Sequence, residues 1–174
     1  VNNEIYEAYP NRDSTPYISE YKFDSKWRTK EFVRGTLRLN GWKNAWSDIF
    51  KMLDNKSPEL NKQIDILGEE LWKKHPYLQD EQDRVVLFVK LLARKDNKEV
   101  FNSFYALDEK GSGENTAMGK LVSITLSCAI DLIAENKMLS GVQAAPHDEK
   151  LINYFFKTFE DYKIFIKNNL KKKK

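Results

Sequence analysis

Residues 85–107 read VVLFVKLLARKDNKEVFNSFYAL, two apolar and aromatic runs separated by a polar turn. The first run, residues 85–92, is apolar on both faces, which suits a strand buried inside a sheet. Residues 95–98 supply the turn, and residues 100–107 are rich in the aromatic side chains that strands favour. The stretch therefore predicts a β-hairpin within a sheet.

Apolar residues at helical spacing surround this hairpin. Residues 116–136 carry them at i, i+3, i+4 and i+7, which predicts a long helix, and a final helix is expected over 148–159. Earlier in the chain, residues 41–54 form an amphipathic pattern. Ser57-Pro58-Glu59 is typical of a helix start, and the stripe that follows continues to Pro76.

Three further segments predict strands, at residues 3–9, 32–39 and 162–166. In the second, alternation places Arg34, Thr36 and Arg38 on one face and Gly35 and Leu37 on the other. We expect an α+β fold: a mixed, largely antiparallel sheet with helices on one face and a small helical excursion over 41–79. The domain should span 1–170, followed by a basic, disordered tail at 171–174.

Charge and composition exclude several classes of protein. The formal charge is 29 − 26 = +3, and the four terminal lysines leave the remaining body at 3 − 4 = −1, so we expect no nucleic-acid partner. No apolar run approaches the span of a bilayer, so no membrane partner is expected. Cys128 is the single cysteine, which favours the cytoplasm or an organelle matrix. The start at Val1 suggests a processed or truncated polypeptide.

The histidines, the cysteine and the glycine-rich turn do not predict a metal or cofactor site. His75 and His147 lie far apart without further ligands, so no metal site is expected, and Cys128 sits on an apolar helix stripe as a buried thiol. The glycine-rich turn that begins at Gly111 lacks the third glycine of a dinucleotide fingerprint and is flanked by acidic residues. We expect no cofactor there, although the following helix N-terminus could attract a carboxylate.

Two motifs carry the functional signal: Tyr9-Pro10-Asn11-Arg12-Asp13-Ser14-Thr15 and Arg34-Gly35-Thr36-Leu37-Arg38. Taken alone, the first has ordinary turn composition and the second could be the solvated face of a sheet. Together, and in this order, they resemble the C-terminal part of saccharopine dehydrogenases. The segments Thr116-Ala117-Met118-Gly119-Lys120 and Gly141-Val142-Gln143 extend the likeness over nearly the whole chain.

The resemblance implies a substrate-binding and dimer-forming domain like the C-terminal domain of glyceraldehyde-3-phosphate dehydrogenase, with a shortened helical insertion. The family's substrate contacts fall on Arg12, Thr36, Leu37 and Arg38, and Asn11, Asp13 and Arg34 are further possibilities. NAD or NADP would be bound by an N-terminal Rossmann domain absent from this chain, so the chain alone should be inactive. The whole enzyme would be a homodimer in lysine metabolism, in the cytoplasm or the mitochondrial matrix. It would interconvert saccharopine with glutamate and aminoadipate semialdehyde.

The chemistry of the motif residues agrees with that role, because saccharopine carries three carboxylates and a guanidinium can hold a carboxylate by two parallel hydrogen bonds. Thr36 would add a hydroxyl donor, Leu37 only its backbone, and Asp13 could orient Arg12. Arg34 is open between facing substrate and forming a structural ion pair. Two alternatives remain: a non-catalytic dimerisation or interaction module, and a dehydrogenase of another carboxylated secondary amine such as carboxynorspermidine.

Overall fold

The computed structural model describes residues 1–142 and 145–170. The chain falls into two compact units. Unit 1 comprises Val1 and Asn3–Glu81, and unit 2 comprises Asn2 and the chain from Gln82 onward. The expected tail at 171–174, and Gln143 of the last motif, lie outside the described residues.

Unit 1 is built on a two-stranded antiparallel sheet of β1 (Tyr6–Pro10) and β2 (Gly35–Leu39). Their register pairs Tyr6 with Leu39 and Pro10 with Gly35. The short helix α1 (Pro16–Glu20) lies in the connection between the strands. The helical excursion expected over 41–79 is present as α2 (Trp42–Ala45), α3 (Ser47–Asp54) and α4 (Leu60–Lys74).

The excursion differs from expectation at Trp46, where the single helix expected over 41–54 is divided into α2 and α3. Gly41 enters α2 with φ +89, a left-handed conformation that glycine adopts without strain. The helix start expected at Ser57 comes later, since α4 begins at Leu60 with Glu59 as its N-cap and without a side-chain cap. The hydroxyl of Ser57 accepts a hydrogen bond from the backbone N–H of Glu59 (3.2 Å) in the turn before the helix.

Unit 2 has a three-stranded antiparallel sheet in the order β3-β4-β5, formed by β3 (Arg84–Lys95), β4 (Lys98–Lys110) and the two-residue β5 (Lys167–Asn168). The predicted hairpin is confirmed. Asp96 and Asn97 both have positive φ, which a two-residue hairpin turn requires and which these residue types tolerate. The last strand begins later than the expected 162–166, since Ile164 and Ile166 pack into the core instead.

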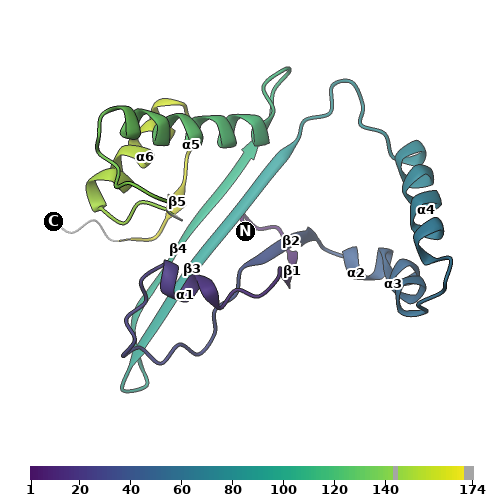
Figure 1. The fold of residues 1–174 in the computed structure, drawn as a ribbon, viewed down its shortest axis with the longest axis horizontal. Coiled ribbons are helices and arrows are strands. Elements are labelled where there is room, and N and C mark those ends of the chain that lie inside the picture. Colours follow the sequence, from purple (N-terminus) through teal and green to yellow (C-terminus); the bar gives the residue numbers. More distant parts are fainter. Residues whose placement is uncertain (143–144, 171–174) are drawn as a thin grey trace. The chain divides into compact units, whose positions relative to one another are not determined.

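Helices α5 (Ala117–Ala134) and α6 (Glu149–Asp161) cover one face of this sheet (Figure 1). Both begin at side-chain caps: Thr116 accepts from Gly119 N–H, and Asp148 accepts from the N–H groups of Lys150 and Leu151. The buried core between helices and sheet comprises Leu107 of β4, Ile124 and Cys128 of α5, and Ile164 after α6. The burial of Cys128 is as predicted, and so is the α+β class with helices on one face.

Two expectations about the sheets are corrected. The described residues form two separate antiparallel sheets instead of one mixed sheet, because β1 and β2 pair with each other and not with β3, β4 or β5. β3 is an edge strand and not a buried one, since β4 is its only neighbour among the described strands. Leu87 and Val89 of β3 are accordingly 55% and 63% exposed.

The expectation that no segment approaches the span of a bilayer is also corrected. Among the described residues, α5 alone is long and apolar enough to cross a membrane by length and composition. Core helices of soluble proteins pass the same test but are mostly buried, whereas 22% of α5 is buried, including Ile124, Cys128 and Leu132, and a single such helix carries little weight. The property is therefore weak evidence for a membrane span.

Candidate functional site

The two sequence motifs meet in unit 1, at the end of the β1–β2 hairpin. The N–H of Asn11 donates to the carbonyl of Arg34 (2.9 Å), and the N–H of Arg34 donates to the hydroxyl of Ser14 (3.0 Å). Ser14 is one of two buried polar residues among the described ones, at 9% exposure. Its hydroxyl thus ties the loop after β1 to the residue before β2.

Arg12 lies at the turn of this loop, with φ +61 and an exposed side chain. Its neighbour Asp13 accepts hydrogen bonds from the N–H (2.9 Å) and hydroxyl (2.7 Å) of Thr15, which lower the pKa of the carboxyl. The contacts of Asp13 are thus made with Thr15 and not with Arg12. The loop presents the Arg12 guanidinium to solvent without an internal partner among the described residues.

The register of the hairpin decides which motif side chains share a face. Thr36 lies opposite Tyr9, and Arg38 lies opposite Glu7. Residues directly opposite in an antiparallel pair project to the same side, so these four side chains share one face. Leu37 projects to the other side, as its place in the alternation predicts.

Arg34 lies just before β2 and stacks on an aromatic ring. Its guanidinium carbon is 3.6 Å from the centroid of the Tyr17 ring in α1. A guanidinium at this distance is attracted by the ring's negative face. The arginine therefore makes a cation–π contact with Tyr17, which the sequence did not predict.

Arg38 also lies over an aromatic ring, at 5.5 Å from the centroid of Trp42 at the start of α2. Trp42 belongs to an aromatic cluster, with ring centroids 5.3 Å from Tyr9, 5.3 Å from Trp46 and 5.5 Å from Phe50. These rings restrict the position of the indole, because they approach it from β1, from the junction of α2 and α3, and from α3. Arg38 itself is exposed, and no carboxylate of the described residues pairs with it.

Glu7 lies opposite Arg38 in the register, yet its carboxylate is engaged elsewhere. One oxygen accepts from Gly41 N–H (2.6 Å), and the other accepts from Lys43 N–H (3.1 Å) and from the Tyr9 hydroxyl. The hydrogen bonds from Tyr9 and then Lys43 lower the pKa of Glu7, and the same bond to Glu7 raises the pKa of Tyr9. The carboxylate opposite Arg38 in the register thus accepts hydrogen bonds from the backbone at the start of α2.

Arg12 follows Asn11, whose N–H donates to the carbonyl of Arg34, and Arg38 lies four residues after Arg34, about 13 Å along an extended strand. The side chains of Arg12 and Arg38 are both exposed.

The glycine-rich turn after β4 does not fit a nucleotide. The carboxylate of Asp83 accepts hydrogen bonds from Ala117 N–H (2.6 Å) and Met118 N–H (2.9 Å), and these lower its pKa. The N-terminus of α5 is therefore capped by the carboxylate of Asp83. The carboxylate that this helix start attracts thus comes from the chain itself and not from a ligand. The backbone N–H groups of Ala117 and Met118 are therefore engaged by Asp83 and do not face a phosphate.

No group of three or more potential metal-ligating side chains occurs in residues 1–142 and 145–170. The site residues that sequence reasoning missed are Glu7, Ser14, Tyr17 and Trp42. Two of them left a local signal, since Glu7 alternates with Tyr9 on the strand facing the second motif and Ser14 stands within the first motif. The others depend on where the chain returns.

The fold is α+β, and unit 1 carries the exposed side chains of Arg12 and Arg38. The chain belongs to the saccharopine dehydrogenase C-terminal domain family, whose model matches residues 2–164 of the 174. It is therefore a domain associated with dehydrogenases, within an oxidoreductase family. Comparison with curated proteins gave no match, and neither did comparison with solved structures.

Proposed function

We propose that this domain binds saccharopine in a saccharopine dehydrogenase, with Arg12 and Arg38 holding its carboxylates. Thr36 contributes a hydroxyl, and Leu37 contributes its backbone groups. Asn11, Asp13 and Arg34 maintain the loop that presents Arg12. The enzyme interconverts saccharopine with glutamate and aminoadipate semialdehyde in the cytoplasm or the mitochondrial matrix.

The observation that carries this proposal is the state of Arg38. Its guanidinium is exposed, rests over Trp42 and has no carboxylate partner in the described residues. Glu7, which could neutralise it, is held by Gly41, Lys43 and Tyr9. A cation kept unpaired on a rigid aromatic support is suited to an external carboxylate, since the guanidinium fork remains available.

The spacing of the arginines supports an elongated substrate. Saccharopine carries carboxylates at both ends of a long chain. Arg38 is about 13 Å along the strand from Arg34, and the carbonyl of Arg34 accepts from the N–H of Asn11, the neighbour of Arg12. Long arginine side chains can shorten that distance from each end. A small anion with one carboxylate would engage only one of the two.

The redox step belongs to a nicotinamide cofactor, which accepts or donates a hydride when bound. We place NAD or NADP on a Rossmann domain of the enzyme outside this chain. The start of α5, which follows the glycine-rich turn, is capped by the carboxylate of Asp83. The residues of this chain bind and orient the substrate.

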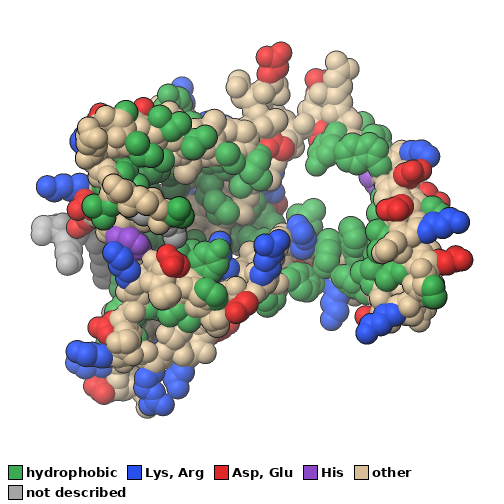
Figure 2. Space-filling view, viewed as in Figure 1, with side chains coloured by type: hydrophobic (Ala, Val, Ile, Leu, Met, Phe, Trp, Pro, Cys, Tyr) green, Lys and Arg blue, Asp and Glu red, His purple; other side chains and the backbone are tan. Residues whose placement is uncertain are grey.

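We also propose that the domain forms a homodimer through α5. Five large apolar residues along one side of this helix are 55–62% exposed: Met118, Val122, Leu126, Ile130 and Ile133. Figure 2 shows hydrophobic side chains gathered over this helix. Contiguous exposed apolar surface on this scale is typical of protein–protein interfaces.

Titration calorimetry on the complete enzyme tests the substrate assignment. Arg12→Ala and Arg38→Ala should each weaken saccharopine binding by about 1.5–3 kcal/mol, the usual contribution of a hydrogen bond to a charged group. Arg28→Ala removes an exposed arginine of the same unit and should bind as the parent does. Unchanged affinity in both motif variants would exclude the assignment.

A further inference from the structure

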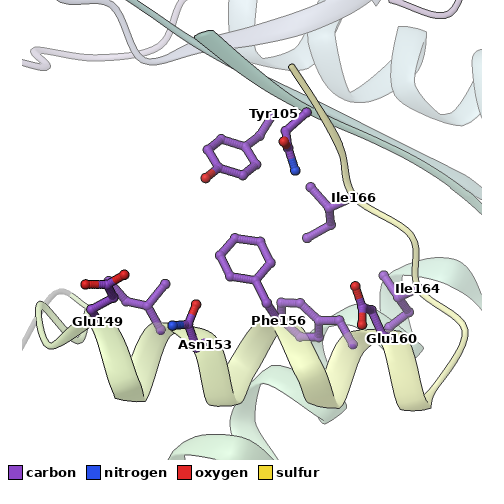
Figure 3. A pocket seen from close by; sticks show the side chains of 10 residues that line it. Tyr105, Glu149, Asn153, Phe156, Glu160, Ile164 and Ile166 are labelled. Carbon is purple, nitrogen blue, oxygen red and sulfur yellow. The ribbon is translucent and has the colours of Figure 1, made fainter. Parts of the chain in front are cut away.

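Unit 2 contains a cavity of about 360 Å³ between α6 and the strands β4 and β5. It is separate from the arginine face of unit 1. Its lining is apolar in the middle and polar at the ends. Tyr105, Phe156 and Ile166 form part of it, and Figure 3 shows the first two turned toward each other across the opening.

One side of α6 forms the long wall of this cavity. Glu149, Asn153, Phe156 and Glu160 recur at i, i+4, i+7 and i+11 and all line it. Eleven residues complete about three helical turns, so these side chains stand in one row. The two carboxylates mark its ends, about 16 Å apart along the helix axis.

A stacked aromatic pair lies between the carboxylates. The rings of Tyr105, from β4, and Phe156, from α6, are 5.7 Å apart between centroids at an interplanar angle of 24°. Ile164, which is 1% exposed, also lines the cavity. Aromatic faces attract ammonium groups, and the aliphatic lining suits methylene chains.

The charge of the lining is of one sign. Glu149 and Glu160 line the cavity, whereas no lysine or arginine does. Neither carboxylate pairs with a cation of the described residues. Asn153 adds an amide between them. The cavity therefore favours a ligand that is positively charged at both ends and apolar between them.

We propose that this cavity binds a linear aliphatic amine with ammonium groups at both ends. The terminal ammonium groups pair with Glu149 and Glu160. The methylene chain lies over Tyr105 and Phe156, where an internal ammonium group gains a cation–π contact. The site is independent of the saccharopine assignment, because it uses none of the same residues.

Spermine at low ionic strength is the probe, titrated into the full 174-residue chain by calorimetry. Binding of one equivalent is expected, with the chain's affinity falling about threefold in Glu149→Gln and in Glu160→Gln, the scale of a single exposed ion pair. Putrescine, which is too short to reach both carboxylates, should bind at least tenfold more weakly.

Glu114→Gln is the matched control, since it removes an exposed carboxylate of the same unit outside the cavity. It should bind spermine as the parent chain does. Absence of spermine binding overturns the proposal. Equal weakening in Glu114→Gln and the two cavity variants also overturns it, because that result indicates attraction to net negative charge alone.

Discussion

Gly111 lies directly against the carboxylate of Asp83, so that a Cβ atom built at Gly111 would come 2.1 Å from Oδ1 of Asp83. The same carboxylate caps the N-terminus of α5 through Ala117 and Met118. Because Gly111 has no side chain, Asp83, just before β3, can reach Ala117 at the start of α5, 34 residues later.

Gly111→Ala should destabilise unit 2 by about 1–3 kcal/mol, because the new methyl group displaces Asp83 and costs the helix its cap. Urea unfolding followed by circular dichroism measures the change. Gly68→Ala is the control, since a Cβ there meets nothing within 4 Å. It should be neutral or stabilising by up to about 1 kcal/mol. Equal stability of Gly111→Ala and the parent would contradict the packing described.

Asp83→Asn should change how stability depends on pH. The hydrogen bonds from Met118 and Ala117 depress the folded pKa of Asp83 below its unfolded value near 3.9. The stabilisation from the charged form is therefore complete above about pH 4 and is lost as the pH falls through the folded pKa.

The difference in unfolding free energy between the parent and Asp83→Asn should consequently be constant near neutral pH and shrink in acid. Denaturant titrations at pH 7, 4 and 3 would measure it. Asp80→Asn serves for comparison, since Asp80 accepts no side-chain hydrogen bond among those described, and it should show no such trend. A difference that grows in acid would disprove the assignment.

Glu7→Gln should lower the pKa of Tyr9 toward its ordinary value, because the carboxylate that raises it loses its charge. The amide oxygen can still accept from Gly41 and Lys43, so the hairpin should keep its fold. Carbon-13 NMR of labelled tyrosine as a function of pH reports the titration, and Tyr9→Phe identifies the resonance. An unchanged Tyr9 titration would mean that Glu7 is not its partner in solution.

Leu126→Glu should raise the dimer dissociation constant at least tenfold, since a charge placed at an apolar interface loses its hydration. Sedimentation velocity over a range of concentrations measures the change. Ser127→Glu adds the same charge to an exposed position of the same helix and should leave the association intact. Identical self-association of both variants would exclude α5 as the interface.

The sequence by itself determined the local elements and the family. Alternation and helical spacing predicted the hairpin of residues 85–107 and the helix that begins after Thr116, because these patterns follow from the geometry of a strand and of a helix alone. The two arginine motifs were recognisable because each is contiguous in the chain.

Only the tertiary structure decided which distant groups meet. Glu7 reaches the backbone of Gly41, Asp83 caps α5, and β3 lies at an edge despite its apolar sequence. Such contacts depend on the path that the chain takes between elements, and a periodic pattern carries no information about that path. The stacking of the exposed Arg38 on Trp42, with Glu7 held by other partners, is therefore a property of the fold and not of the local sequence.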